Sequence, residues 1–480
     1  MILVLSGDKN KETKAAFKTQ KIHGTSMKSF ITIMAVVVLT ASVASAVTFT
    51  NLYNFSLDAF NYGSPDEATN GDGISPIGCV LSGNVIYGTC SSGGLYGDGT
   101  IFRVNTDGTH FTNLFNFSNG VFNAQNNTYP DSTGQDPNPG LLLVSNTLYG
   151  TTFEGGLHYA GEVFKINTNG SGFTVVHFFN FDDGQGPASG LTLYNNVLYG
   201  TTTDGTNTYG TVYGVNLSDL SFFSVYQFTN WTQPYGGVVA ISNNFYGFAY
   251  YGGAYLQGYV YRVGSSGFAD LFDFNGTNGG PSYATPVASG NTIYGATIYG
   301  GTNSSGNIFR INADGNAFTN LYNFSPADGA NTDGADPDEM SGMILSGNTL
   351  IGTTSGRGSG GQGTVFSVKT DGTGFTVLHS FQFSDGSQPD ALMLSGGTIY
   401  GLTDYGIQGT YLGNGGVFAL ILQPTLNLAQ GGTNVVLSWT GSSYSLYSAP
   451  TANGTFTKIT GATSPYTNGI SGTQKYFKLE

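Results

Sequence analysis

Residues 141–179 of the chain are LLLVSNTLYGTTFEGGLHYAGEVFKINTNGSGFTVVHFF. Apolar, β-branched and aromatic residues gather there in four short runs, at 141–144, 147–152, 162–167 and 173–179. Polar and glycine-rich breaks separate the runs, and this pattern predicts four short strands. The break Asn167-Thr168-Asn169-Gly170 predicts a tight hairpin turn, because Asn and Gly both tolerate positive φ.

The same pattern recurs along the chain, and a Tyr-Gly step marks each copy. The marker residues are Tyr87, Tyr149, Tyr199, Tyr246, Tyr294, Ile351 and Tyr400. Successive copies lie 47 to 62 residues apart, which suits four short strands with their loops, the size of one β-propeller blade. Asp-Gly pairs at the hairpin position predict aspartates that form turns rather than catalyse, at Asp107, Asp314 and Asp371.

The two ends of the repeat region complement each other. The last copy stops after Val417-Phe418-Ala419-Leu420 and lacks a fourth strand, whereas Phe49–Phe55 carries the pattern of a fourth strand alone. A first strand that pairs into the last blade would close a ring and leave no exposed sheet edge. The sequence therefore predicts an all-β fold, a seven-bladed β-propeller closed by the N-terminal strand.

A family resemblance is carried by three short units. They are Leu148–Thr152, the Gly-Thr-Val-aromatic step at Gly210–Tyr213, and the turn Asn105–Gly108. Together they resemble the GloVer tandem repeat of bacterial "choice-of-anchor" proteins, over residues 47 to about 423. The resemblance implies an exported or surface protein and implies no known reaction.

The chain divides into three predicted segments. Residues 1–46 combine six lysines, an apolar run at Phe30–Leu39 and the small-residue motif Ala44-Ser45-Ala46, which is typical of a cleaved signal peptide that starts at Met1 or Met27. A retained membrane anchor is the alternative. Residues 47–423 form the propeller. Residues 424–480 form a small β-sandwich-like module, with Trp439 in its core, that resembles fibronectin-type or immunoglobulin-like modules.

Charge and composition exclude several partners. The net charge is −14, and removal of the lysine-rich leader makes the chain more acidic still. Nucleic acids and anionic membranes need clustered Lys or Arg, so we expect neither as a partner. After processing we expect a monomer with no integral membrane span, secreted or at the cell surface. Cys79 and Cys90 are either bridged or free thiols, and the spacing leaves both open.

Candidate binding residues follow the Tyr-Gly-Thr-Thr segment, where one position differs from copy to copy. We expect this position to lie near the propeller axis, where tyrosine rings beside carboxylates suit sugar recognition. The alternative is that these are ordinary solvated loop residues. His177 and His379 share a strand position with Tyr53 and Tyr322 and are predicted to be structural. The predicted substrate-binding residues are Glu154, Asp204, Tyr251, Tyr299, Arg357, Asp404 and Tyr405.

Three functions remain open from the sequence. The first is a binding or interaction module for a glycan or a protein. The second is a polysaccharide-active hydrolase or lyase that uses paired carboxylates such as Glu154 and Asp204, and the third is a structural cell-envelope protein. We assign no catalytic residue, metal ligand or cofactor. Acidic residues at Asp328–Glu339 and at Asp182-Asp183 leave bound calcium open.

Overall fold

The computed structural model describes residues 3–6, 47–56, 70–130, 132–206, 209–326, 331–337, 342–406, 414–422, 426–431, 434–439, 445–450, 455–469 and 474–479. Apart from Leu3–Ser6, the expected leader at 1–46 lies outside these residues. The chain separates into two compact units, one of Phe49–Ile421 and one of Met1–Thr48 with Leu422–Glu480. Every regular element within the described ranges is a β-strand, which confirms the all-β prediction.

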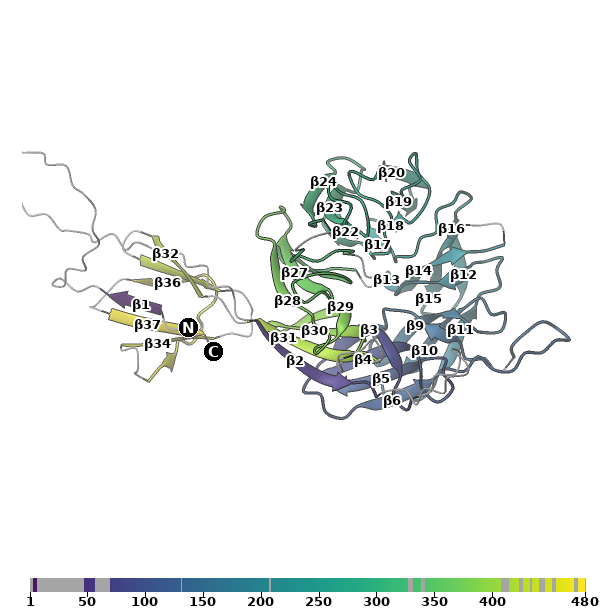
Figure 1. Ribbon diagram of the computed structural model, residues 1–480, viewed down its shortest axis with the longest axis horizontal. Helices are drawn as coiled ribbons and strands as arrows, with labels where there is room; N and C mark the ends of the chain where they lie inside the picture. Colours follow the sequence, from purple (N-terminus) through teal and green to yellow (C-terminus); the bar gives the residue numbers. More distant parts are fainter. Residues whose placement is uncertain are drawn as a thin grey trace, which may run out of the picture. The chain divides into compact units, whose positions relative to one another are not determined.

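The larger unit contains seven antiparallel sheets in its described residues. Five have four strands, and two have five because two short strands share the innermost position. In Figure 1 the sheets follow one another in chain order around a common centre, a β-propeller-like arrangement. The innermost strands are β3 (Ile74–Ser82), β7 (Gln135–Pro137) with β8 (Leu142–Val144), β12 (Gln185–Pro187) with β13 (Thr192–Tyr194), β17 (Val239–Ile241), β21 (Val287–Ser289), β25 (Ile344–Ser346) and β29 (Ser387–Ser395).

The second and third strands form the middle of each sheet. The second strands are β4 (Val85–Ser92), β9 (Thr147–Glu154), β14 (Val197–Asp204), β18 (Asn244–Ala249), β22 (Thr292–Thr297), β26 (Thr349–Thr354) and β30 (Thr398–Tyr405). The third strands are β5 (Thr100–Asn105), β10 (Glu162–Asn167), β15 (Thr211–Asn216), β19 (Tyr259–Gly264), β23 (Asn307–Asn312), β27 (Thr364–Lys369) and β31 (Gly416–Leu422).

The outermost strands include the N-terminal strand of the unit. They are β6 (Thr112–Asn116), β11 (Thr174–Phe178), β16 (Phe222–Gln227), β20 (Ala269–Asp273), β24 (Thr319–Asn323), β28 (Thr376–Ser380) and β2 (Val47–Asn54). The last of these, β2, pairs with β31 of the C-terminal sheet of this unit, as the sequence predicts. Innermost strand β29 of that sheet packs against β3 of the first sheet.

The Tyr-Gly step has a steric cause. In the second sheet Gly150 lies directly opposite Phe164 of the third strand. A Cβ atom on Gly150 would lie 2.5 Å from the ring of Phe164, and that ring is fully buried. Glycine therefore makes room for a core aromatic side chain, and the same clash recurs between Gly88 and Phe102.

Aromatic stacking joins each outermost strand to the next sheet. Tyr53 stacks on Phe111 at 4.0 Å between ring centroids, and His177 stacks on Phe222 at 3.7 Å. The other pairs in this set are Phe115–Phe173, Tyr226–Phe268, Phe272–Phe318, Tyr322–Phe375 and His379–Phe49. Since ring pairs add to the free energy of burial, these contacts stabilise every interface between neighbouring sheets.

The Asp-Gly turns differ from the prediction in one respect, because their aspartates do not adopt positive φ. In these turns the glycine does, as at Gly108 (82°), whereas Asp107 accepts hydrogen bonds from the backbone and hydroxyl of Thr109. The aspartate is thus a turn former through its carboxylate. Cys79 and Cys90 are free thiols, and Cys79 lies opposite Gly88, where its Sγ donates to the carbonyl of Ala391.

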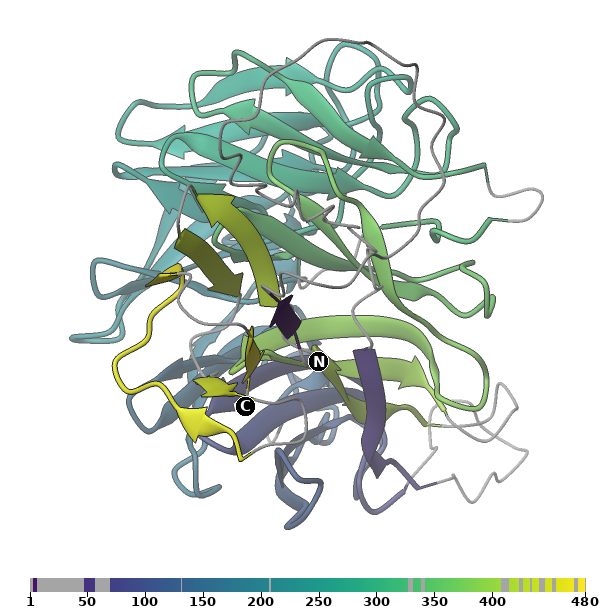
Figure 2. The same cartoon turned by 90° about the vertical axis from the view of Figure 1, so that its left-hand side faces the viewer.

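The smaller unit contains two short sheets in its described residues. One has the order β1 (Leu3–Ser6), β37 (Gln474–Leu479), β34 (Leu446–Ala449) and β35 (Thr457–Lys458), and the other has β32 (Leu426–Gly431), β33 (Asn434–Trp439) and β36 (Tyr466–Gly469). Trp439 is buried with Leu437, Leu446 and Phe477. Figure 2 shows these strands from another side, with β1 in purple and the others in yellow-green to yellow.

Candidate functional site

The candidate site lies on one side of the larger unit, which we call the loop face. It is made by the loops that join second to third strands and by the loops that lead from each outermost strand to the next innermost strand. Antiparallel pairing places both kinds of loop at the same end of the sheets. Glu154, Asp204 and Tyr405 are the last residues of β9, β14 and β30, whereas Tyr251 and Tyr299 lie two residues beyond β18 and β22.

Two of the predicted site residues share a hollow. Arg357 and Tyr405 line a space of about 470 Å³ between the sheets that contain β26 and β30. The remaining lining residues are Ser355, Gly356, Gly361, Gln362, Ser387 and Gln388, so no carboxylate lines it. Guanidinium, amide and hydroxyl groups therefore surround a space of the size that small ligands occupy in proteins.

Asp404 precedes Tyr405 in β30 and holds the side chain of Tyr405 in place. It forms side-chain hydrogen bonds with Ser75 and Tyr405, and burial raises the pKa of its carboxyl above the usual range. The charge of Asp404, with burial and their hydrogen bond, in turn raises the pKa of the Tyr405 hydroxyl. Tyr405 is thus held by its hydroxyl, while 38% of the side chain stays exposed.

Tyrosine rings gather over the fourth and fifth sheets. Tyr250 stacks on Tyr283 at 4.6 Å and meets the rings of Tyr235 and Tyr251 edge-on. Asp204 lies close enough to Tyr235 to raise the pKa of its hydroxyl, although burial is the main cause. We call Tyr235, Tyr250, Tyr251 and Tyr283 the tyrosine cluster. Its exposed member, Tyr251, was predicted from the sequence.

Glu154 has a partner that the sequence did not suggest. Its carboxylate accepts a hydrogen bond from the hydroxyl of Tyr159 at 3.0 Å. Burial, with the nearby charge of Glu154, raises the pKa of Asp136 to about 6. The described contacts link Glu154 to Asp136 and Asp204 to Tyr235, and none links Glu154 with Asp204.

Backbone geometry marks a further set of residues, which lie at the start of an innermost strand or in the loop that leads to it. Asp136, Gln233, Asp336 and Gln388 are not glycines, yet each has positive φ. Each donates its N–H to a carbonyl of the preceding sheet, for example Gln388 to Gln362 at 3.0 Å. Such strained positions cluster at binding sites. The sequence did not predict these positions, because the presence of Asp or Gln does not by itself indicate a left-handed backbone conformation.

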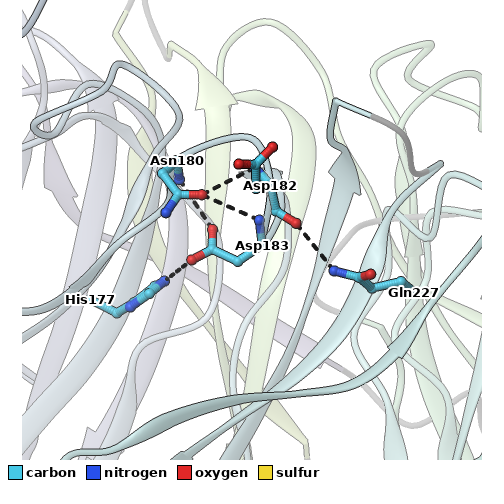
Figure 3. Close-up of polar contacts among 5 residues, drawn as sticks. All are labelled: His177, Asn180, Asp182, Asp183 and Gln227. Carbon is cyan, nitrogen blue, oxygen red and sulfur yellow. Dashed lines mark hydrogen bonds and ion pairs between the residues drawn. The ribbon is translucent and has the colours of Figure 1, made fainter.

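The two histidines are structural. Figure 3 shows the Nε2 atom of His177 against the carboxylate of Asp183, at 3.0 Å, while Asp183 also accepts from the backbone N–H of Asn180. In the same figure Gln227 donates to the backbone carbonyl of Asp182. His379 and Asp385 repeat the pair at 2.8 Å. In other sheets the same place holds Tyr53 with Asp72 and Tyr322 with Asp333.

Metal ligands are not gathered among the described residues: no group of three or more His, Cys, Asp or Glu side chains could hold an ion there. Of the acidic loop at Asp328–Glu339, Asp328, Asp338 and Glu339 lie outside the described residues. Asn331 and Asp333 in that loop form hydrogen bonds that tie it to β24 and to Ser325. The described part of the chain also has no helix of the length and apolarity that a membrane crossing requires.

Comparison with known proteins finds one repeat family. The Gloeobacter/Verrucomicrobia repeat matches at residues 39–233, 122–267 and 205–335, which together span more than half of the chain. No curated protein matches.

Solved structures resemble the fold at low identity. The oligogalacturonate lyase from Vibrio parahaemolyticus is 10% identical, with a TM-score of 0.45, over 78% of this chain and 98% of its own. The tricorn protease is 13% identical with a TM-score of 0.38 over 76% of this chain, but the match spans only 33% of the protease. TolB from Acinetobacter baumannii is 16% identical with a TM-score of 0.34, over 57% of this chain and 58% of TolB.

Proposed function

We propose, from the premise that the chain belongs to the Gloeobacter/Verrucomicrobia repeat family, that it is an exported or cell-surface module that binds a glycan on the loop face. The observation that carries the proposal is that the loop face holds both the tyrosine cluster and the hollow at Arg357 and Tyr405. Tyrosine offers a flat apolar ring and a hydroxyl together, which suits the alternating CH and OH groups of a sugar. The basic leader of residues 1–46 supports export, with cleavage after Ala46.

The proposed scaffold is a closed propeller of seven blades. Two contacts between the seventh and first sheets support closure. Tyr53 of β2 stacks on Phe111 at 4.0 Å, and Pro76 packs where a Cβ on Gly415 would lie. The same Gly–Pro contact joins Gly363 to Pro389 in the preceding interface. A closed ring holds the loop face rigid, which lowers the entropy cost of ligand binding.

The C-terminal unit has a separate proposed role. Residues 424–480 resemble fibronectin-type or immunoglobulin-like modules, and we assign them to sorting or attachment rather than to ligand capture. Fusion of this segment to an exported reporter tests the assignment. Retention of the reporter at the cell surface supports it, and equal release into the medium with and without the segment contradicts it.

A glycan array with the purified mature chain tests binding. Tyr250→Ala and Tyr251→Ala should each weaken binding of the best glycan by at least tenfold, because each removes a ring of the cluster. Phe223→Ala, an exposed aromatic change near the opposite end of β16, should leave it unchanged. Equal binding by all three variants would contradict the proposed site.

An enzyme is the second candidate, and the raised pKa of Asp136 beside Glu154 is the observation that favours it. A glycoside hydrolase needs one protonated and one ionised carboxyl group. A hydrolysis and lyase assay on the glycan selected by the array separates the two candidates. Turnover that Glu154→Gln abolishes would replace binding with catalysis as the function.

A further inference from the structure

We infer that the hollow at Arg357 binds the carboxylate of a single acidic sugar residue, such as a uronic acid at the end of a glycan. The inference rests on the proposed glycan binding and deepens it by naming the ligand group. Three observations on Arg357 carry it: its place among the cations of the unit, its lack of a partner and its backbone conformation.

Within residues 49–421, Arg357 is the one Lys or Arg that does not lie in the third strand of a sheet. The other five basic residues of 49–421 lie within β5, β10, β19, β23 and β27, at Arg103, Lys165, Arg262, Arg310 and Lys369. The loop face otherwise carries carboxylates and neutral groups. An anionic ligand group that reaches this face therefore has one cation to meet, and that cation lines a hollow.

The guanidinium group of Arg357 is unpaired within the described residues. It takes part in none of their ion pairs or hydrogen bonds, and the side chain is exposed. Asp336 is near enough for Arg357 to oppose the rise in pKa that burial causes in that carboxyl, yet the two groups form no ion pair within 4.0 Å. Asp404 is engaged by Ser75 and Tyr405. The five donors of the guanidinium thus remain available to a ligand.

The backbone conformation at Arg357 supports a binding role for its side chain. Its φ is 65°, and its carbonyl accepts the N–H of Gly363. The same hydrogen bond recurs in four other sheets, where glycines with φ of 75–82° stand in its place, at Gly93, Gly155, Gly252 and Gly300. Glycine adopts this conformation without strain and arginine does not. Gln388 across the hollow is strained in the same way.

The chemistry of the lining selects a carboxylated sugar. A guanidinium binds a carboxylate through two parallel hydrogen bonds. The side-chain amides of Gln362 and Gln388 can bond sugar hydroxyls, and the exposed ring of Tyr405 can stack on a sugar face. The net charge of −14 disfavours a long polyanion on this chain, so we assign one acidic residue rather than an acidic polymer.

Titration calorimetry with two matched disaccharides tests the inference on the full mature chain. Cellobiose and its uronic-acid analogue, with a glucuronate at the non-reducing end, differ only in that carboxylate. We expect the uronate to bind at least tenfold more tightly than cellobiose. Arg357→Gln should abolish this difference, whereas Arg310→Gln, a cation in β23, should preserve it.

The outcomes separate this inference from the proposed function. Equal affinity for the two disaccharides, or a preference that survives Arg357→Gln, would overturn the carboxylate site while glycan binding stands. Failure of both disaccharides and of every array glycan to bind would overturn both. Tighter binding of a sulfated disaccharide, or of a tripeptide with a free C-terminal carboxylate, would overturn the assignment to a carboxylated sugar.

Discussion

Arg357 occupies a position of the repeat that is glycine in four other sheets. In four sheets the position is glycine, because the loop after the second strand turns through a left-handed residue. In the sixth sheet an arginine occupies the same backbone conformation and projects into a hollow. Natural repeats preserve what the fold needs, so a residue that costs stability is explained best by binding.

Replacement of Arg357 separates backbone strain from side-chain loss. Arg357→Gly should be more stable than Arg357→Ala by about 1 kcal/mol, because alanine keeps the left-handed strain and glycine relieves it. Urea unfolding of the two variants measures the difference. Equal unfolding midpoints would show that the loop carries no strain at this position.

Glu162 is a second residue that lowers the stability of the folded state. It is fully buried at the start of β10, neither carboxylate oxygen has a hydrogen-bond partner, and burial raises its pKa well above the ordinary value. Its counterparts in three sheets are Thr100, Thr211 and Thr364. The folded state therefore keeps this carboxyl protonated at pH values where the unfolded chain ionises it.

The pH dependence of stability follows from that difference. Above the unfolded pKa, near 4.3, Glu162 should lower the free energy of unfolding by about 1.4 kcal/mol per pH unit, until the folded pKa is reached. Glu162→Gln removes this slope, so its advantage over wild type should be larger at pH 7 than at pH 4. Asp182→Asn in an exposed loop is the control. Parallel stability curves for wild type and Glu162→Gln would contradict the account.

At the scale of elements, the aromatic residues of the outermost strands that stack on the next sheet differ in their polar partners. His177 and Tyr322 each form a hydrogen bond with an aspartate. Where the ring is Phe115, Thr133 stands at that place, and its hydroxyl accepts the backbone N–H of Ser118 at 3.0 Å. One role, fastening the end of an outermost strand, is thus met by two residue pairs.

Exchange of one pair for the other tests this equivalence. Asp183→Ala should cost about 1–3 kcal/mol, because His177 and the N–H of Asn180 lose their acceptor. The double variant His177→Phe with Asp183→Thr copies the Phe115–Thr133 pair and should recover most of the loss in chemical unfolding. A double variant less stable than Asp183→Ala would show that the pairs are not interchangeable.

The sequence predicts the elements well where the pattern is periodic. β10 spans the predicted Glu162–Asn167, and β9 starts at the predicted Thr147. β7 was missed because Gln135-Asp136-Pro137 carries no apolar alternation, although Gln135 pairs with Glu154 and Pro137 with Thr152. Periodicity reports burial on a sheet face, and it gives no signal for a short strand without apolar side chains.

The site was predictable as a set of positions but not as a geometry. Comparison of the repeats identified Arg357 and Tyr405, which the structure brings to one hollow. The same comparison paired Glu154 with Asp204, whereas the structure places Asp136 near Glu154. The geometry of a site between neighbouring sheets depends on backbone turns, such as the left-handed turn at Asp136. These turns cannot be predicted from the repeat pattern.

For the whole molecule, the central question is whether the N-terminal strand seals the ring. Deletion of residues 47–55 removes β2, exposes the edge of β31 and eliminates the stacking of Phe49 on His379. An exposed edge strand favours self-association. We expect a lower melting temperature and oligomers in size-exclusion chromatography. A chain that ends at Gln423 is the control and should melt as the full chain does.

A deletion variant that melts at the wild-type temperature and elutes as a monomer would rule out closure by β2. The strand order of the sheets also gives the larger unit two distinct ends. All the second strands end on the loop face, whereas the Asp-Gly hairpins, such as Asp107-Gly108, lie at the opposite end of the sheets.

Hydrogen exchange of the mature chain, with and without the saccharide that binds best, tests the binding face most directly. The account predicts that the saccharide slows amide exchange in the segments around Tyr250–Tyr251, Arg357–Gln362 and Ser387–Gln388. Exchange in the hairpins at the opposite end should be the same with and without the saccharide. Protection confined to those hairpins, or to residues 426–479 of the C-terminal unit, would contradict it.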